Sequence, residues 1–154
     1  MQTFNDIDYQ HGDLALLYEA LQVCFDEITR LMVLQPKVNK QRLRYQISAA
    51  VDIRLNAIAT MNRILRECSA DILPKFSLDE KALRRLACSS SVNSLTKFIA
   101  DSAQNMELIK NIKCYIQNSE IKLELVHIID ALVQSHERLQ FENEESVSNE
   151  QENK

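Results

Sequence analysis

The sequence has almost no glycine and little proline: among 154 residues there are one glycine, Gly12, and two prolines, Pro36 and Pro74. Hairpin turns and phosphate-binding loops depend on glycine, because glycine tolerates positive φ and lets other groups approach its backbone closely. This scarcity argues against hairpins, a P-loop and a dinucleotide-binding loop. The chain is built instead from residues that tolerate or favour helices. We therefore expect an all-α fold.

Other absences limit where the protein acts. No apolar run approaches the roughly 20 residues that span a bilayer, and the polar N-terminus, MQTFNDIDYQHGD, lacks a signal-peptide pattern. The sequence has no C-x-x-C pair, because its four cysteines are far apart: Cys24, Cys68, Cys88 and Cys114. We expect reduced thiols, no membrane contact and a cytoplasmic location, with the nucleus as a second possibility. Disulfides are the alternative, because the cysteine count is even.

The length corresponds to about one domain. We expect a flexible N-terminal arm over residues 1–12, a single helical domain over 13–141 and a disordered acidic tail over 142–154. The tail, ENEESVSNEQENK, holds five glutamates and one apolar residue, too little apolar surface to order it. The domain is predicted to be a bundle of five or six helices.

The apolar spacing and the helix breakers place the boundaries of these helices. In chain order we expect helices at about 14–34, 39–72, 78–87, 92–103, 105–117 and 120–141. Asp13 is the expected N-cap of the first helix, and Pro36 follows its end. Ser77 and Glu80 form a capping box, and the serines at 89–91 favour a restart.

The long second helix, about 39–72, suggests a partner. Unbroken, it would measure about 50 Å, whereas a compact domain of this size has a radius of gyration of roughly 15 Å. No glycine or proline marks a kink within it. The helix must kink, project or pack along a partner. We therefore expect binding to another protein and self-association, with a dimer as the favoured form.

A basic stretch, KVNKQRLRYQ at 37–46, stands within an acidic chain of net charge −4. On a helical wheel its charges spread around the cylinder, whereas a helix that tracks phosphates should concentrate them on one face. We interpret them as solvated side chains, with an acidic protein or nucleic acid as alternative contacts. The candidate partner-binding residues on this reasoning are Lys40, Arg44, Arg84 and Arg85.

Arg54 is a further partner-binding candidate, because it lies inside an apolar stripe with Val51 and Ile58. A buried arginine must find a carboxylate or carbonyl groups. One interpretation is a satisfied pair within the chain. The other is an anchor in a protein interface, where arginine is enriched.

Little in the sequence supports chemistry. Glu124 and His127 have the Glu-x-x-His spacing of di-iron bundles, but the chain has no second such pair. We expect His127 to face water and His136, on the apolar stripe, to be a hydrogen-bonded core or edge residue, with pH sensing as the alternative. No nucleophile motif is present. We therefore expect no catalytic residue, no cofactor and no metal.

The sequence thus favours a non-enzymatic protein–protein interaction module, an adaptor, regulator or small chaperone that acts through helical surfaces. The alternative is a nucleic-acid-associated accessory factor that uses the basic residues of 37–44 and 84–85. Residues 83–99 have the outline of a helix-turn-helix, although Ser91 takes the turn position where glycine is usual. An enzyme ranks third and would require a pocket with at least two titratable groups.

Overall fold

The computed structural model describes residues 10–68 and 94–152. These residues form four α-helices and one short 3-10 helix: α1 (Gln10–Leu34), η1 (Gln35–Lys37), α2 (Gln41–Cys68), α4 (Leu95–Tyr115) and α5 (Ser119–Glu152). The described ranges contain no strand. The expected all-α fold is confirmed for them.

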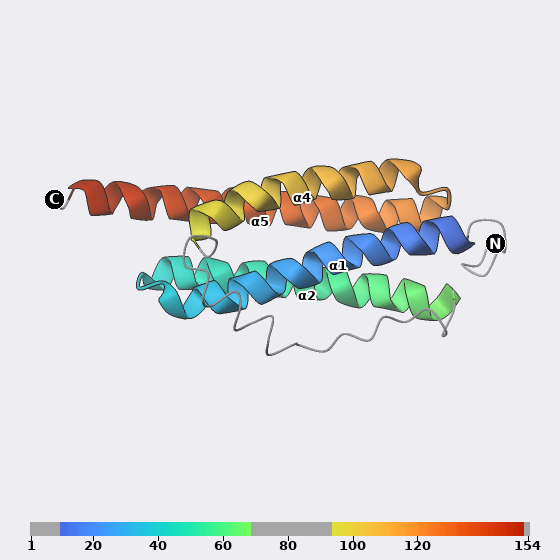
Figure 1. Cartoon of the computed structure of the whole chain (residues 1–154), viewed down its shortest axis with the longest axis horizontal. Helices are drawn as coiled ribbons and strands as arrows, with labels where there is room; N and C mark the ends of the chain where they lie inside the picture. The colour runs from blue at the N-terminus through green and yellow to red at the C-terminus, as the bar shows by residue number, and fades with distance from the viewer. Residues whose placement is uncertain (1–9, 69–93, 153–154) are drawn as a thin grey trace.

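The four α-helices form an elongated bundle in which neighbours run antiparallel (Figure 1). Contacts between helices follow the ring α1–α2–α5–α4 and return to α1, so each helix packs against two others. η1 joins α1 to α2 at one end of the bundle, and a short turn joins α4 to α5 at the other. The first of these is termed the η1 end below.

The core consists of two apolar clusters, and each α-helix contributes to both. The larger cluster fills the half of the bundle away from the η1 end, with these buried residues: Leu14, Leu17, Ala20, Leu21, Cys24, Ala57, Met61, Ile64, Leu65, Ile109, Ile112, Ile116, Ile121, Leu125, Ile128, Ile129 and Leu132. The smaller cluster fills the η1 end: Leu31, Leu34, Leu43, Ile47, Ala50, Leu95, Phe98, Ile99 and Leu139. On every helix a buried polar residue lies between the two clusters, so a polar layer divides the core: Glu27, Arg54, Ser102 and Ser135.

Asp13 does not cap the first helix as expected, because α1 begins earlier, at Gln10. Its buried carboxylate accepts the backbone N–H groups of Gln117 and Asn118, each at 2.9 Å. The side chain of Asn118 in turn accepts the N–H groups of Glu120 and Ile121, which open α5. Asp13 therefore ties the turn between α4 and α5 to the start of α1.

The two helices expected at 92–103 and 105–117 form a single helix in the structure. The break expected near residue 104 is absent, and α4 continues from Leu95 to Tyr115 with Ser94 as its N-cap. It continues because Ile99, Ser102 and Ile109 keep the same face against the bundle across the expected break. The expected helix at 78–87 lies outside the described residues, as do residues 1–9 of the expected N-terminal arm.

The acidic segment after residue 141 differs from expectation, because α5 continues as a helix to Glu152. Polar contacts to other helices hold its first turns. Glu142 forms an ion pair with Arg42 of α2, and Asn143 donates a hydrogen bond to Thr96 of α4 at 3.2 Å. The segment has little apolar surface to bury, and these polar contacts depend on neighbours that the sequence does not show.

The length of α2 is accommodated within the chain. Its 28 residues correspond to about 42 Å at 1.5 Å per residue, and α1 and α5 both pack along it. The expectation that so long a helix must kink, project or find another chain assumed a compact globule, whereas this bundle is elongated (Figure 1). A case for a partner must therefore rest on the surface.

A buried polar layer and a candidate interaction groove

Arg54 is the centre of the buried polar layer and is only 1% exposed. Its Nε donates to the Oε1 of Glu27, itself 3% exposed, at 2.8 Å. Nη1 donates to the backbone oxygen of Ala50 at 2.9 Å and to the hydroxyl of Ser135 at 3.3 Å, and Nη2 donates to the hydroxyl of Ser102 at 3.4 Å. The guanidinium thus joins all four helices.

Local sequence explains how the bundle holds this charge. Serine on α4 and on α5 leaves room for the planar guanidinium and supplies a hydroxyl acceptor. Asn105 donates to the second carboxylate oxygen of Glu27 at 3.0 Å, so both oxygens of this acid have a partner. The ring of Phe98 lies beside the layer, and its centroid is 5.8 Å from the guanidinium carbon of Arg54. The acid and the base are therefore both compensated by groups of the bundle itself.

Arg54 accordingly takes the first of its two expected roles, a satisfied pair within the chain. It is not exposed at the surface of this bundle, so its side chain is not available there as an interface anchor. The spacing placed it on the core face, but the sequence alone did not show that Glu27, 27 residues earlier, is its partner.

Two titratable side chains lie near this layer. Burial raises the pKa of the Cys24 thiol to about 12, and the charge of Glu27 adds to the rise. Burial also lowers the pKa of the half-buried His136 side chain, with a further lowering by the charge of Arg54. Cys24 is therefore an unreactive thiol at neutral pH, and His136 is an edge residue of the layer.

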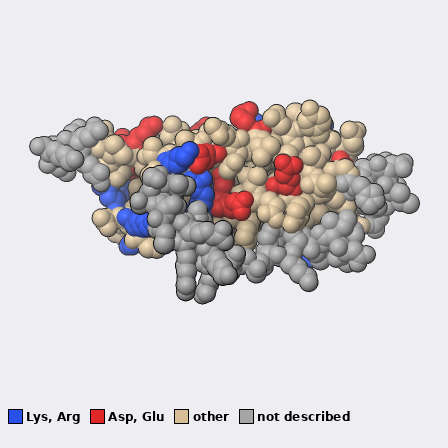
Figure 2. Space-filling model, viewed as in Figure 1, with Lys and Arg blue, Asp and Glu red and all other residues tan. Residues whose placement is uncertain are grey.

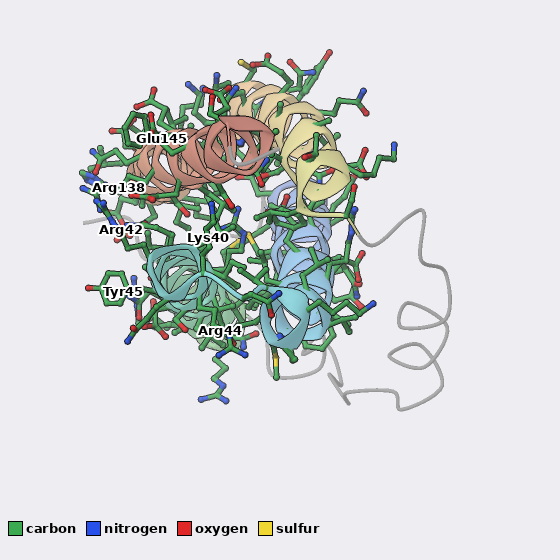
Figure 3. The ribbon with its side chains drawn as sticks, turned by 90° about the vertical axis from the view of Figure 1, so that its left-hand side faces the viewer. Lys40, Arg42, Arg44, Tyr45, Arg138 and Glu145 are labelled. Atoms are coloured by element: carbon green, nitrogen blue, oxygen red, sulfur yellow. The ribbon has the colours of Figure 1, made fainter. Side chains whose placement is uncertain are left out.

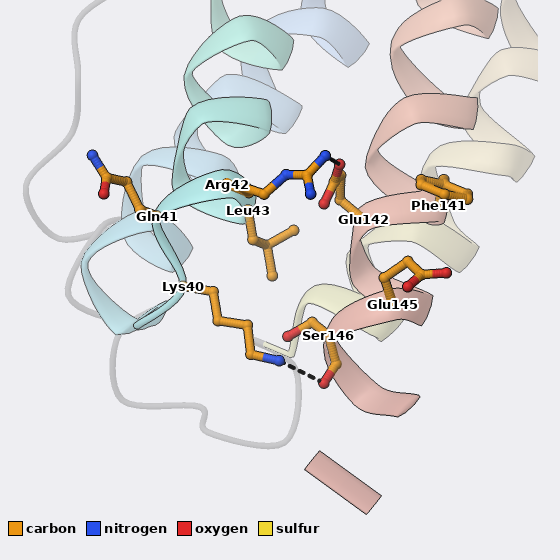
Figure 4. Close-up of a pocket in the computed structure, with 8 residues that line it drawn as sticks. All are labelled: Lys40, Gln41, Arg42, Leu43, Phe141, Glu142, Glu145 and Ser146. Atoms are coloured by element: carbon orange, nitrogen blue, oxygen red, sulfur yellow. Dashed lines mark hydrogen bonds and ion pairs between the residues drawn. The ribbon is translucent and has the colours of Figure 1, made fainter. Parts of the chain in front are cut away.

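A groove lies at the η1 end between the start of α2 and the end of α5 (Figure 4). It has a volume of about 500 Å³ and is lined by Lys40, Gln41, Arg42, Leu43, Phe141, Glu142, Glu145 and Ser146. A second hollow of about 440 Å³ shares Arg42 and Glu142 and extends to Tyr45. The two are therefore parts of one surface, termed the α2–α5 groove below.

Charges of both signs line this groove. The ammonium group of Lys40 donates to the backbone oxygen of Ser146 at 3.0 Å, and Arg42 pairs with Glu142 at 3.5 Å (Figure 4). The Arg42 side chain is 87% exposed, so solvent screens this pair and it contributes less than about 1 kcal/mol to stability. Figure 2 shows basic side chains gathered toward the end of the bundle where α1 meets α2, with acidic side chains beside them.

Two aromatic side chains flank the groove and are largely exposed. Tyr45 on α2 is 70% exposed and Phe141 on α5 is 58% exposed. Seen from the η1 end, Tyr45 projects outward from α2, and Arg42 and Arg138 lie on the same side of the bundle (Figure 3). The seam between α2 and α5 continues away from this end as a shallower hollow of about 180 Å³ beside Ala131 and His127.

Of the five expected partner-binding residues, only Lys40 lines the groove. Arg44 is exposed but points away from it (Figure 3), Arg54 is buried, and Arg84 and Arg85 lie outside the described residues. The sequence reasoning missed Tyr45, Phe141 and the acidic wall. One signal was present: neither aromatic belongs to the apolar stripe of its helix.

The arrangement shows no grouping suited to a metal. Within residues 10–68 and 94–152, no cluster of three or more histidine, cysteine or acidic side chains could hold an ion. His127 is exposed, as expected, on the seam between α2 and α5. In the same ranges no helix has the length and apolarity needed to cross a membrane.

Comparison of the chain with protein-family models gave no match. Comparison with curated proteins and with solved structures gave no match either.

Proposed function

We propose that the protein is a non-enzymatic interaction module that binds another protein through the α2–α5 groove. The observation that carries this proposal is the exposure of Tyr45 and Phe141 on the two helices that form the groove. Aromatic side chains are enriched in the centres of protein interfaces, because each buries about 150–250 Å² and loses little conformational freedom. Here they stand on rigid helices, which keeps the entropy cost of binding low.

The charges of the groove indicate the chemistry of the partner. Lys40 directly precedes α2 and Arg42 lies in its first turn, whereas Glu142 and Glu145 come from α5. A polyanion would be attracted by one wall and repelled by the other. A helical segment that carries an apolar side chain between an acidic and a basic group satisfies both walls. This favours a protein partner over nucleic acid.

The groove is a poor setting for catalysis. Arg42 and Glu145 are exposed to solvent, and Lys40 already donates to a backbone carbonyl. Acid–base and electrostatic catalysis gain most where water is excluded and pKa values are shifted. These features support binding as the role of the site.

Photo-cross-linking tests the proposal directly. A benzophenone amino acid replaces Tyr45 in the full chain, and a matched control replaces Leu123, an exposed residue of α5 on the half of the bundle away from the η1 end. Cross-linking is carried out in the cells that make the protein, and mass spectrometry identifies the attached peptide. We expect a peptide with both charge signs attached at position 45, and a loss of that adduct when Phe141→Glu is added.

The same adducts at positions 45 and 123 would overturn the proposal, because the partner would then contact the groove no more than the control surface. Attachment of RNA or DNA at position 45 would replace it with the nucleic-acid alternative. Circular dichroism of each variant confirms that the bundle is still folded.

A further inference from the structure

At the η1 end, α5 extends past the other helices of the bundle (Figure 1). The segment that leads into this projecting end carries Glu142, Glu144 and Glu145, and the last turn of α5 has no basic residue. The C-terminal end of a helix dipole is negative, and a basic residue in the last turn, which α5 lacks, would stabilise it by about 0.3–1 kcal/mol. Helical turns that extend beyond the packed part of a bundle are also marginally stable in water. The projecting end would therefore be stabilised by a basic surface.

At the start of α2 the side-chain charge is likewise unfavourable for the helix dipole, but with the opposite sign. Its first turn contains Arg42 and Arg44 and no acidic residue, although the N-terminal end of a helix dipole is positive. Arg42 pairs with Glu142 of the same chain through an exposed contact of 3.5 Å, while Arg138 and Glu145 of α5 are exposed. The groove thus presents a basic wall and an acidic wall side by side, and both walls have charge facing solvent.

A surface that carries both members of a charge pair is complementary to itself. A two-fold axis at the η1 end brings the acidic wall of each copy to the basic wall of the other, because in a two-fold interface every contact occurs twice. If the axis is to bury the exposed aromatic side chains as well, Phe141 of one copy must lie against Tyr45 of the other.

We propose that the occupant of the α2–α5 groove is a second copy of this chain, docked about a two-fold axis with Arg42 of each copy facing Glu145 of the other. This inference rests on the proposed function and names its partner. The four aromatic side chains supply roughly 400–700 Å² of buried area, and the two projecting ends of α5 must supply the rest of the about 1,600 Å² of a standard interface. Because more than half of that area is polar helix surface, the dimer should be of moderate affinity and salt-sensitive.

Charge reversal in the full chain tests the pairing. Sedimentation velocity measures the dimer dissociation constant of the wild type, of Arg42→Glu, of Glu145→Arg, and of an equimolar mixture of the two variants. Each variant alone meets two like-charge contacts in its homodimer, so its dimer should weaken by at least about tenfold. In the mixture both contacts join opposite charges, and the dissociation constant should return to near the wild-type value.

Arg63→Glu is the matched control. Arg63 lies on the same helix and forms a comparable exposed pair with Glu124 at 3.4 Å, far from the η1 end. This variant should dimerise like the wild type. Thermal unfolding of each variant shows that the bundle is intact.

A wild type that is monomeric at about 100 μM, or a mixture that fails to restore the dimer, overturns the proposal. The proposed function is judged separately. If the groove cross-links at position 45 to a different protein while the wild type stays monomeric, the groove binds and only its occupant is wrong. If neither dimer nor site-specific cross-link is found, both proposals fail.

Discussion

Replacing Arg54 with methionine tests the role of the polar layer most sharply. The substitution keeps an unbranched side chain of similar length but removes a positive charge and four hydrogen bonds inside the core. Glu27, 3% exposed, is left with Asn105 as its remaining partner. Removal of one member of a buried ion pair typically costs about 3–5 kcal/mol. We expect a loss of this size in the free energy of unfolding.

Urea denaturation followed by circular dichroism at 222 nm measures the loss. With a slope of about 2 kcal/mol/M, the midpoint should fall by roughly 1.5–2.5 M. Arg63→Met on the same helix removes an arginine that is 49% exposed, and should change stability by less than about 1 kcal/mol. Both variants remove one positive charge from α2, so the difference between their losses in stability measures the effect of burial.

The double variant Glu27→Leu and Arg54→Met completes the cycle. Replacement of both members of a buried pair by apolar residues is often neutral or stabilising. Here Ser102 and Ser135 can bond to carbonyls of their own helices instead, so we expect the double variant to lie within about 2 kcal/mol of the wild type. The reasoning fails if Arg54→Met costs under about 1 kcal/mol, or if the double variant costs as much as the two single variants added together.

Three further outcomes follow from the bundle. Asp13→Ala removes both acceptors of the α4–α5 turn and should cost about 2–4 kcal/mol in urea unfolding, whereas Asp52→Ala, at an exposed position, should change little; equal effects would exclude the anchoring role. The pKa of His136 is lowered in the folded state, chiefly by burial, so the unfolded chain binds a proton more readily than the folded one. The free energy of unfolding therefore falls as pH drops through 6.5, the ordinary pKa of histidine. Between pH 7.5 and 5.5 the wild type should lose more unfolding free energy than His136→Gln, and identical slopes would contradict this. Iodoacetamide at pH 7.5 should modify the exposed Cys114 in the native protein and Cys24 only after unfolding, as read by peptide mass spectrometry; rapid native modification of Cys24 would show that it is not buried.

The sequence predicted the fold class because helix formation depends on local residues. Scarce glycine and three-and-four apolar spacing define the faces of α1, α2 and α5, and the structure buries Leu17, Ile47 and Leu125 on those faces. The helix ends were harder to place. The break expected near residue 104 is absent, and Ser102 and Asn105 on either side of it form hydrogen bonds with Arg54 and Glu27 of other helices.

The candidate groove could not be predicted, because it depends on which helices become neighbours. Arg42 and Glu142 lie 100 residues apart and meet through the packing of α2 against α5. Sequence spacing carries no information on such a pairing when the connecting segments are long. The aromatic side chains could have been noticed as exposed, but not as neighbours.

Amide hydrogen exchange of residues 142–148 at low and high protein concentration tests the central claim most directly, that the projecting end of α5 is completed by a second copy of the chain. We expect exchange in this segment to slow as the protein concentration rises from about 1 to 100 μM, while the backbone amides of Leu125 and Leu132 in the core stay equally protected. Exchange of residues 142–148 at the same rate across that range would contradict it.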